Sequence, residues 1–481
     1  MKKNDIGVIG LAVMGENLIL NIESKGFSVS IYNRTAQKVS QLLETRARGK
    51  NIQGAYSLEE FVDQLERPRK VMLLVKAGDA VEDLINQIIP LLEPGDIIID
   101  GGNSNYLDTI RRTELVESKG LLYIGTGVSG GEEGALRGPS IMPGGSKQAW
   151  PHVKPIFQAI AAKVDGSPCC DWVGDNGSGH YVKMIHNGIE YGDIQLICEA
   201  YHLMRDLLDM DSGEIASKFA YWNQTDLSSF LIEITADILN YKNENGIYEV
   251  DCILDRAGHK GTGIWTGVTA LELGVPLTLI CESVFSRILS SMKDDRVNAS
   301  KVITKAAPVF NGDKNAFIDD IGKALLASKI VSYAQGFELL KAASASYGWE
   351  LDYGSIALMW RGGCIIRSVF LGTIKEAFER DPGLKNLMLA LYFRQKLEQS
   401  LPSWRRVAST AILNGIPAPA FCSALAYFDG YTCANLPANL LQAMRDYFGA
   451  HLYERIDAPR GQFFHTNWTG KGGTTTAAPP S

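Results

Sequence analysis

The chain has 481 residues, of which 46% are hydrophobic and 21% are charged, as is usual for a globular protein of two to four domains. Its formal net charge of -7 argues against a nucleic acid partner, because neutralising phosphates needs a basic surface. The sequence has no run of 18 apolar residues and no signal-peptide pattern, so we expect a cytoplasmic protein without a membrane-spanning segment. The eight scattered cysteines form no CxxC pair, and we expect them to be reduced.

The first pattern in the chain is an apolar strand at residues 6–9, followed at once by the turn GLAVMG and a helical run. This order brings backbone N–H groups and a helix N-terminus onto a pyrophosphate, so it predicts a dinucleotide-binding site. Alanine replaces the usual middle glycine, and such a fingerprint alone is a weak signal. The predicted cofactor contacts are Gly10, Leu11, Ala12, Val13, Met14 and Gly15.

The next strand, at residues 28–32, ends in Asn33, Arg34 and Thr35. An NAD-binding domain usually carries an acidic residue at this point, about 20 residues after the fingerprint. The sequence has an arginine there instead, and an arginine fork suits a 2′-phosphate. We therefore predict NADP as the cofactor, the alternative being that Arg34 is an ordinary turn residue.

Strands and helices continue to alternate, which predicts a parallel sheet with its ligand at the carboxyl ends of the strands. The expected elements are strands at 70–75, 96–100, 121–125 and 169–173, and helices at 80–92 and 106–119. Loops after the first three strands should border the ligand. The first two would contact the cofactor through Val75, Lys76, Ala77 and Asn103. The third, residues 125–145, is rich in glycine, and we expect Ser129, Gly130 and Gly131 to bind a carboxylate or hydroxyl groups.

From about residue 178 onward almost the whole pattern is helical. The predicted fold is an α/β Rossmann-type doubly wound sheet over 1–177, a large all-α domain over 178–434, and a C-terminal segment with an extended tail over 435–481. A faint repeat offset by about 140 residues suggests a duplicated helical bundle. Its clearest instance pairs GEIA at Gly213 with GSIA at Gly354.

One helical stretch, residues 179–193, carries an unusual polar face. Helical spacing places Lys183, His186, Asn187, Glu190 and Tyr191 on one side. A solvated helix face is the simpler interpretation, but such faces are mostly lysine and glutamate. Glycines 177, 179, 188 and 192 would also let another group approach the backbone closely. We interpret this face as half of an active site. The second copy has Ser332 and Tyr333 at the corresponding positions of His186 and Asn187, so we expect it to be structural.

Other cationic residues lie further along the chain. Lys260 lies in a Gly-Thr loop that resembles a phosphate cradle, and Arg287 follows on a predicted helix. Arg445 and His451 lie near the end, before a Gly- and Thr-rich tail that cannot form its own core. The aromatic residues of the tail should therefore dock on another surface, for which a partner subunit is the best candidate.

The motifs GLAVMG, NRT, DGGNSNY, GVSGGEEGA, KMIHNGIEYGD, HKGTG, RDYFGAH and FHTNWTG occur in this order. With them the chain resembles the 6-phosphogluconate dehydrogenase family over essentially its whole length. Its Gly-Thr-rich end is similar to the eukaryotic form, except for residues 474–481. The resemblance implies a homodimeric enzyme of the pentose phosphate pathway that converts 6-phosphogluconate and NADP to ribulose 5-phosphate, carbon dioxide and NADPH.

The resemblance also implies roles for the site residues. Lys183 would be the general base, and Glu190 would protonate carbon 1 of the enediol. Carboxylate and hydroxyl contacts would come from Asn103, Ser129, Gly130, His186 and Asn187, and phosphate contacts from Tyr191, Lys260, Thr262 and Arg287. Arg445 and His451 would come from the second subunit, and no metal is expected.

Two alternatives remain. A β-hydroxyacid dehydrogenase without decarboxylation would need no phosphate site, and Lys260, Arg287 and Arg445 count against it. A catalytically silent NADP-binding protein is disfavoured because Lys183 and Glu190 are both present.

Overall fold

The computed structural model describes residues 3–258 and 261–471. They form two compact units, the first ending at Leu425 and the second beginning at Ala426. The boundaries of the three predicted domains stay a prediction. Within the described ranges, no helix is long and apolar enough to cross a membrane.

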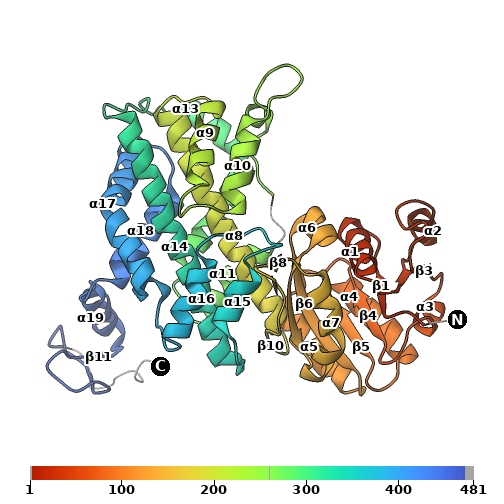
Figure 1. Ribbon diagram of the computed structural model, residues 1–481. Helices are drawn as coiled ribbons and strands as arrows, with labels where there is room; N and C mark the ends of the chain where they lie inside the picture. The colour runs from red at the N-terminus through yellow and green to blue at the C-terminus, as the bar shows by residue number, and fades with distance from the viewer. Residues whose placement is uncertain (1–2, 259–260, 472–481) are drawn as a thin grey trace. The chain divides into compact units, whose positions relative to one another are not determined.

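The first part of the chain forms an eight-stranded sheet (Figure 1). Its strands are β1 (Ile6–Ile9), β2 (Val29–Tyr32), β3 (Ile52–Gly54), β4 (Lys70–Leu73), β5 (Ile97–Asp100), β6 (Leu122–Ser129), β7 (Ser140–Gly145) and β10 (Gly174–Asp175). They are ordered β10-β7-β6-β5-β4-β1-β2-β3. The chain reverses its winding direction between β1 and β4, and open sheets bind ligands at such a point.

Helices cover both faces of this sheet, as the doubly wound prediction requires. They are α1 (Val13–Ser24), α2 (Ala36–Glu44), α3 (Leu58–Asp63), α4 (Asp79–Ile88), α5 (Tyr106–Glu117), α6 (Gly131–Arg137) and α7 (Trp150–Ile160). On one face, α1, α2 and α7 bury their apolar residues against the sheet, and on the other α3, α4 and α5 do so. Because both faces are covered, the central strands are mostly apolar, as in IGVI of β1 and the three isoleucines that precede Asp100 in β5.

The structure corrects three details of the predicted sheet. Residues 125–145 are not one loop, because β6 extends to Ser129 and is followed by α6 and β7. Strand β7 pairs with β6 in the antiparallel direction, so the sheet is mixed. No strand covers residues 169–173, where Cys170 forms only a single bridge to Ile141 before the short β10.

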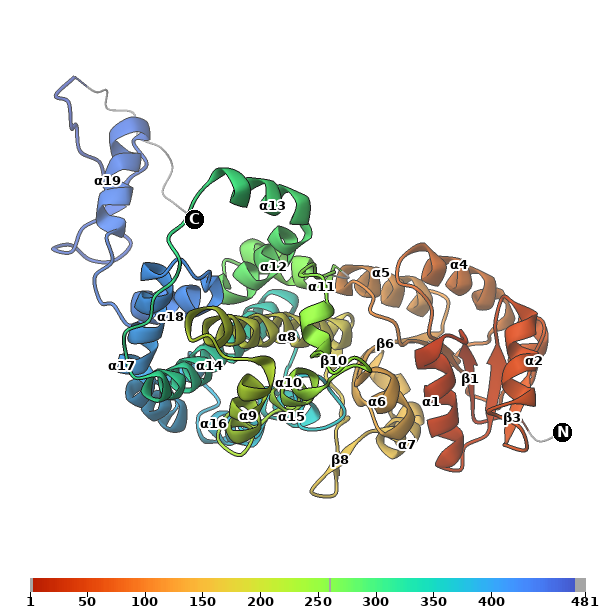
Figure 2. The same ribbon diagram turned by 90° about the horizontal axis from the view of Figure 1, so that it is seen from above.

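The helical part begins with α8 (Ser178–His202). Ten helices follow it: α9 (Ser212–Trp222), α10 (Phe230–Asn240), α11 (Thr262–Glu272), α12 (Thr278–Ser291), α13 (Lys293–Val302), α14 (Lys314–Tyr347), α15 (Tyr353–Met359), α16 (Leu371–Arg380), α17 (Leu391–Leu413) and α18 (Pro419–Tyr431). Helix α8 packs against α14, α11, α12, β6 and β7, and Figure 2 shows it in the middle of the helical part. It is therefore buried almost all round.

The predicted internal repeat is visible in the order of the helices. Helices α9, α10 and α12 begin at residues 212, 230 and 278, and α15, α16 and α18 begin at residues 353, 371 and 419. Each pair is separated by 141 residues. The two copies meet at a buried ion pair in which Lys329 Nζ of α14 lies 2.5 Å from Asp193 Oδ2 of α8. Lys329 lies 146 residues after Lys183, near but not at the 141-residue offset of the helices, and Asp193 is its structural partner.

The second unit contains α19 (Ala438–Gly449) and the two-stranded pair β11 (Tyr453–Glu454) and β12 (Phe463–Phe464). The buried Asp446 of α19 accepts hydrogen bonds from Thr466 N at 3.0 Å and from Trp468 Nε1 at 2.9 Å. Part of the aromatic tail therefore docks on its own unit, whereas the sequence suggested a partner subunit.

Candidate active site

The turn after β1 leaves no room for a side chain at Gly10 or Gly15. Gly10 has a φ of +111°, and a Cβ atom there would lie 2.4 Å from the Leu74 carbonyl oxygen. A Cβ at Gly15 would lie 1.9 Å from the Gly10 carbonyl oxygen. The N-cap of α1 is Ala12, whose side chain makes no capping hydrogen bond. The first N–H groups of α1 therefore remain for an anionic ligand.

A cavity of about 880 Å³ lies at this turn. Most predicted cofactor residues line it, namely Gly10, Leu11, Ala12, Val13, Met14, Asn33, Arg34, Thr35, Val75, Lys76 and Asn103. Gly15 and Ala77 do not line it. Asn33 has a structural role as well, because its Oδ1 accepts a hydrogen bond from Leu11 N at 3.1 Å. The cavity and its donors fit a dinucleotide.

Lys38, which no sequence motif singled out, also lines this cavity. It lies in the first turn of α2, four residues after Arg34, and this closeness in the sequence was the available signal. Within the described chain neither cation has an ion-pair partner. Two unpaired cations beside Thr35 favour a doubly charged phosphate at this end of the cavity.

The loop after β5 is fixed by the buried carboxylate of Asp100. This side chain accepts hydrogen bonds from Ser104 Oγ at 2.6 Å, Gly102 N at 3.0 Å and Arg112 Nη1 at 3.1 Å. Asn103, which lies between these anchors, borders both the dinucleotide cavity and a small cavity at α8. The structure thus places Asn103 at both cavities.

The polar face of α8 is buried rather than solvated, since Lys183 is 7% exposed and His186 is 0% exposed. Lys183 Nζ lies 2.8 Å from Asn187 Oδ1 and 3.3 Å from His186 Nδ1. His186 Nδ1 lies 4.0 Å from Glu190 Oε2, and its Nε2 lies 3.4 Å from Ser129 Oγ. Four of the predicted residues on α8 and one on β6 therefore form a single cluster.

Burial changes the acid–base behaviour of this cluster. Removal from water lowers the pKa of Lys183, although the nearby Glu190 carboxylate opposes this. Burial and the neighbouring Lys183 hold the pKa of His186 well below its usual range. A lysine of this kind loses its proton more easily than an exposed one, and a neutral amine can act as a general base.

Glycines allow α8 to approach the sheet. A Cβ at Gly127 of β6 would lie 2.3 Å from Lys183 Cβ, and one at Gly179 would lie 2.3 Å from the Gly125 carbonyl oxygen. Added Cβ atoms at Gly188 and Gly192 would meet Thr266 and Ser332. The groups that approach the glycines of α8 are thus parts of the protein itself, and not a ligand as the sequence suggested.

The predicted phosphate residues are brought together in part. Arg287 of α12 lies over the ring of Tyr191, with Cζ 3.6 Å from the ring centre. Thr262 begins α11, and a Cβ at the next residue, Gly263, would lie 2.8 Å from the same ring. Lys260 lies outside the described residues. Arg445 and His451 belong to the second unit, where Arg445 Nη1 donates to Gln442 Oε1 at 3.2 Å.

The second helical copy contributes to the walls of the site, which the sequence did not indicate. A Cβ at Gly130, next to the cluster, would lie 2.6 Å from the carbonyl oxygen of Gly363. The Trp360 ring lies edge-on to His186, with ring centres 5.9 Å apart. Both follow α15, so the second copy has a supporting role.

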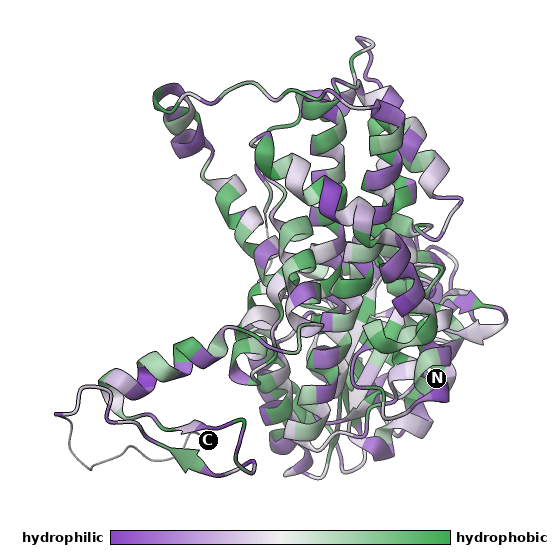
Figure 3. Cartoon of the chain, turned by 90° about the vertical axis from the view of Figure 1, so that its left-hand side faces the viewer, coloured by the Kyte–Doolittle hydropathy of each residue, from purple (hydrophilic) through white to green (hydrophobic). Residues whose placement is uncertain are grey.

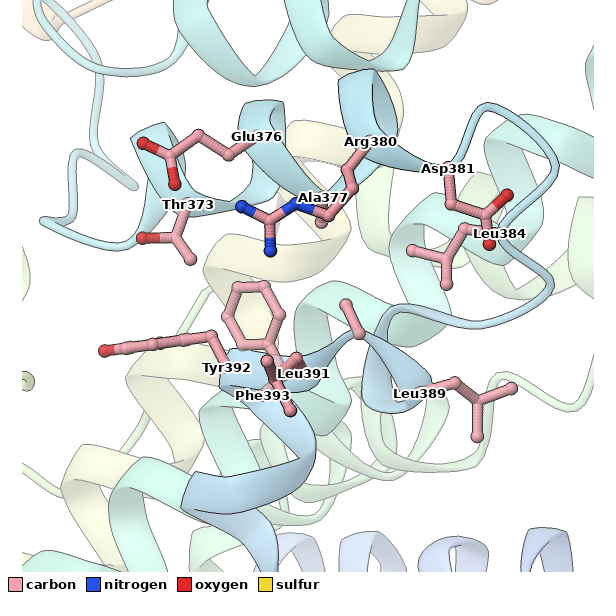
Figure 4. Close-up of a pocket in the computed structure, with 11 residues that line it drawn as sticks. Thr373, Glu376, Ala377, Arg380, Asp381, Leu384, Leu389, Leu391, Tyr392 and Phe393 are labelled. Atoms are coloured by element: carbon pink, nitrogen blue, oxygen red, sulfur yellow. The ribbon is translucent and has the colours of Figure 1, made fainter.

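Another cavity, of about 240 Å³, lies between α16 and the start of α17 (Figure 4). Its walls include Arg380, Tyr392 and Phe393, and none of the predicted site residues line it. The chemistry of α8 is therefore separate from this cavity.

Comparison with known proteins agrees with this geometry. Residues 5–174 match the model of the NAD binding domain of 6-phosphogluconate dehydrogenase, and residues 179–468 match that of the 6-phosphogluconate dehydrogenase C-terminal domain. The chain belongs to the 6-phosphogluconate dehydrogenase family.

Full-length relatives show the same family. The decarboxylating 6-phosphogluconate dehydrogenase of sheep (Ovis aries) is 59% identical over 480 residues, covering 99% of each chain. That of Haemophilus influenzae is also 59% identical, covering 99% of this chain and 98% of its own. The sheep relative agrees with the eukaryotic resemblance, although a bacterial 6-phosphogluconate dehydrogenase is equally similar.

A solved 6-phosphogluconate dehydrogenase has the same fold. The Plasmodium falciparum protein, described with its cofactor NADP+ and its substrate 6-phosphogluconate, superimposes with a TM-score of 0.94 at 46% identity. The match covers 96% of this chain and 100% of the other. The Rossmann-type domain followed by a helical domain is therefore confirmed.

Proposed function

We propose that this chain oxidises and decarboxylates 6-phosphogluconate with NADP, giving ribulose 5-phosphate, carbon dioxide and NADPH. Family membership supports the reaction. The observation that carries the proposal is the buried Lys183, whose pKa is lowered and which lies with Asn103 on one small cavity beside the dinucleotide cavity.

The residues around the larger cavity fit NADP. The backbone of residues 10–14 and the N-terminus of α1 would bind the pyrophosphate. Arg34 and Lys38 would bind the 2′-phosphate, and Asn103 would lie beside the nicotinamide end. NADP, when bound, supplies the acceptor for the hydride.

Lys183 would act as the general base. The neutral amine takes the proton from the hydroxyl on carbon 3 as the hydride leaves, while Asn187 Oδ1 holds Nζ at 2.8 Å. The resulting 3-keto acid loses carbon dioxide, because a β-keto carboxylate can delocalise its electrons into the ketone. The protonated Lys183 then stabilises the developing charge on the ketone oxygen.

Glu190 would complete the reaction as an acid. It lies one helical turn after His186 on the same face of α8, and it would protonate carbon 1 of the enediol. Ser129, Gly130, Gly131, His186 and Asn187 would bind the carboxylate and hydroxyls. Tyr191, Lys260, Thr262 and Arg287 would bind the phosphate.

The active protein would be a homodimer in which Arg445 and His451 of one subunit contact the substrate of the other. Exposed apolar side chains on two helices support this, because a monomer rarely exposes so many. On α12 they are Phe285, Ile288 and Leu289, and on α19 they are Leu440, Leu441, Met444, Tyr447 and Phe448. Figure 3 shows hydrophobic and hydrophilic residues side by side on the helix before the C-terminal hairpin. A cytoplasmic location stays a prediction.

The test follows NADPH absorbance and carbon dioxide release together, on purified protein with 6-phosphogluconate and NADP. Equal yields of the two products are expected. NADPH without carbon dioxide would favour a simple β-hydroxyacid dehydrogenase, and the absence of NADPH would favour a silent NADP-binding protein.

A further inference from the structure

Arg112 of α5 is a buried charged residue that the proposed mechanism does not use. It is 0% exposed, and it does not line the dinucleotide cavity. A buried charge needs partners, because taking it out of water is costly. The position of those partners therefore shows which parts of the protein the charge holds together.

The first partners of Arg112 lie in the loop after β5. Its Nη1 donates to Asp100 Oδ2 and to Ser104 Oγ, each at 3.1 Å. Ser104 Oγ in turn donates to the same carboxylate oxygen at 2.6 Å, and Asp100 Oδ1 accepts from Gly102 N at 3.0 Å. Residues 101–103, which lie between Asp100 and Ser104, all line the dinucleotide cavity. Arg112 thus holds both ends of this short segment.

The other partners of Arg112 lie at the start of α4. Its Nε donates to Glu82 Oε1 at 2.9 Å, and its Nη2 donates to the Gly78 carbonyl oxygen at 3.4 Å. Gly78 is the N-cap of α4, and Glu82 lies in the first turn. Residues on both sides of this N-cap line the dinucleotide cavity, namely Val75, Lys76, Ala80, Asp83, Leu84 and Gln87. One guanidinium therefore contacts two separate segments of the same cavity wall.

The bond between Arg112 and α4 is charge-assisted. Burial raises the pKa of Glu82, but the hydrogen bonds and charges of Arg111 and Arg112 outweigh burial and hold this pKa below its usual value. Glu82 is therefore ionised at neutral pH. Hydrogen bonds between ionised groups are about twice as strong as those between neutral groups, so the link between the two segments is a firm one.

Sheet topology assigns these segments to one end of the cofactor. Strands β4 and β5 lie on one side of the reversal point between β1 and β4, and β2 lies on the other side. Arg34 follows β2, at the end proposed for the 2′-phosphate. The segments held by Arg112 follow β4 and β5, so they border the opposite, nicotinamide half of an extended dinucleotide.

We propose that Arg112 is a positioning residue for the nicotinamide half of NADP: its guanidinium ties the loop after β5 to the start of α4 and keeps both in the arrangement that binds this half. The inference rests on the proposed function, because it concerns the proposed cofactor. A planar guanidinium can bind two separate carboxylates at once, which a lysine ammonium does less well. Buried ion pairs add little stability compared with apolar side chains of similar size, so stability alone does not account for this one.

The test measures the binding of two ligands to Arg112→Lys, which keeps the positive charge and loses the fork. We expect the dissociation constant of NADP to rise about tenfold, because the two segments must then be ordered on binding. Adenosine 2′,5′-bisphosphate carries the 2′-phosphate and lacks the nicotinamide half. Its dissociation constant should stay within about twofold of the wild-type value, whereas a general loosening of the domain would weaken both ligands.

The neighbouring arginine provides a matched control. Arg111 is on the same helix and also binds Glu82, but it is exposed, and its other partner in the described chain is Asp108. Arg111→Ala should therefore leave the binding of both ligands unchanged. If it weakened NADP as much as Arg112→Lys does, the contacts of Arg112 with the two segments would not be the cause, and the inference would be wrong.

A second pair of variants decides the question if Arg112→Lys does not fold. Glu82→Ala removes the carboxylate link to α4 and leaves Arg112 paired with the more deeply buried Asp100. It should weaken NADP and spare adenosine 2′,5′-bisphosphate, as Arg112→Lys does. Glu82→Gln keeps an oxygen that can accept from Arg112 Nε, so it should restore most of the NADP affinity.

Unchanged NADP binding in both Arg112→Lys and Glu82→Ala would overturn the inference, and so would an equal loss of affinity for the two ligands. Wild-type protein that fails to give equal NADPH and carbon dioxide would instead refute the proposed function. The two failures are distinguishable, because one is measured as ligand binding to variants and the other as products of the wild type.

Discussion

Lys183 combines a basic side chain with an environment that disfavours its charge. Only 7% of the residue is exposed, and its polar partners, Asn187 and His186, are uncharged at neutral pH. Lysine is one of the residue types least often fully buried, so a buried lysine with no salt bridge to any residue that the structure describes suggests function.

Substitution of this lysine gives the first prediction. Lys183→Met keeps a side chain of similar length and removes the amine, so turnover should be abolished while NADP binding, measured by fluorescence titration, is retained. Full activity in this variant would rule out the proposed mechanism.

The pH dependence has a definite sign. The amine must be neutral to accept a proton, and burial lowers its pKa below the usual value of 10.5. As pH rises through the lowered pKa, kcat/KM should increase, and it should level off before pH 10.5. If kcat/KM instead rose only at or above pH 10.5, Lys183 would not be desolvated in solution.

In the proposed site, Arg34 would set the cofactor preference. Arg34→Asp replaces the guanidinium with a carboxylate, which repels the 2′-phosphate of NADP and suits the ribose hydroxyls of NAD. NADP binding should weaken by about 3 kcal/mol, more than a hundredfold, and NAD binding much less. If the dissociation constants for NADP and NAD rose by the same factor, Arg34 would not be the residue that binds the 2′-phosphate.

At the scale of elements, α8 lies against β6 and β7 because glycines occupy the contact. A Cβ at Gly179 would lie 2.3 Å from the Gly125 carbonyl oxygen and 2.5 Å from that of Met142. These are backbone atoms, which cannot move aside as a flexible side chain can. The position of Lys183 therefore depends on the absence of side chains one turn before it.

Two helical glycines make a matched test of this contact. Gly179→Ala should destabilise the protein by about 1–3 kcal/mol or more through overpacking. Gly372 of α16 has no atom within 4 Å of an added Cβ, so Gly372→Ala should be neutral or stabilise by up to about 1 kcal/mol. Denaturation midpoints measure both, and equal effects would contradict the packing argument.

Sequence patterns predicted the elements whose signals are local. The turn at Gly10 and the polar face of α8 are examples, since adjacent residues define both. Strand β7 was missed because its glycine-rich sequence, SIMPGG, reads as a turn, although pairing with β6 makes it extended. Trp360 was missed because its partner His186 lies far away in the sequence.

At the scale of the whole molecule, the proposed site would need two subunits. If Arg445 acts across the interface, inactive Lys183→Met and Arg445→Ala variants should complement each other. In a mixed dimer, one site would then hold Lys183 of one chain and Arg445 of the other. Equal amounts of the two variants, unfolded and refolded together, should recover about a quarter of wild-type activity, because half the dimers are mixed and each has one intact site. Activity no higher than the sum of the separate variants would place Arg445 in its own subunit's site.

The duplication of the helical part also has a consequence for how the chain can be divided. Lys329 of the second copy and Asp193 of the first form a buried ion pair, and both side chains are at most 1% exposed. Separating such a pair leaves a buried charge without a partner, at a cost of about 3–5 kcal/mol. The two helical copies therefore form one folding unit. Neither copy could be exchanged for another domain or occur without the other. A chain cut between α13 and α14 would be expected to fold only when both pieces are made together.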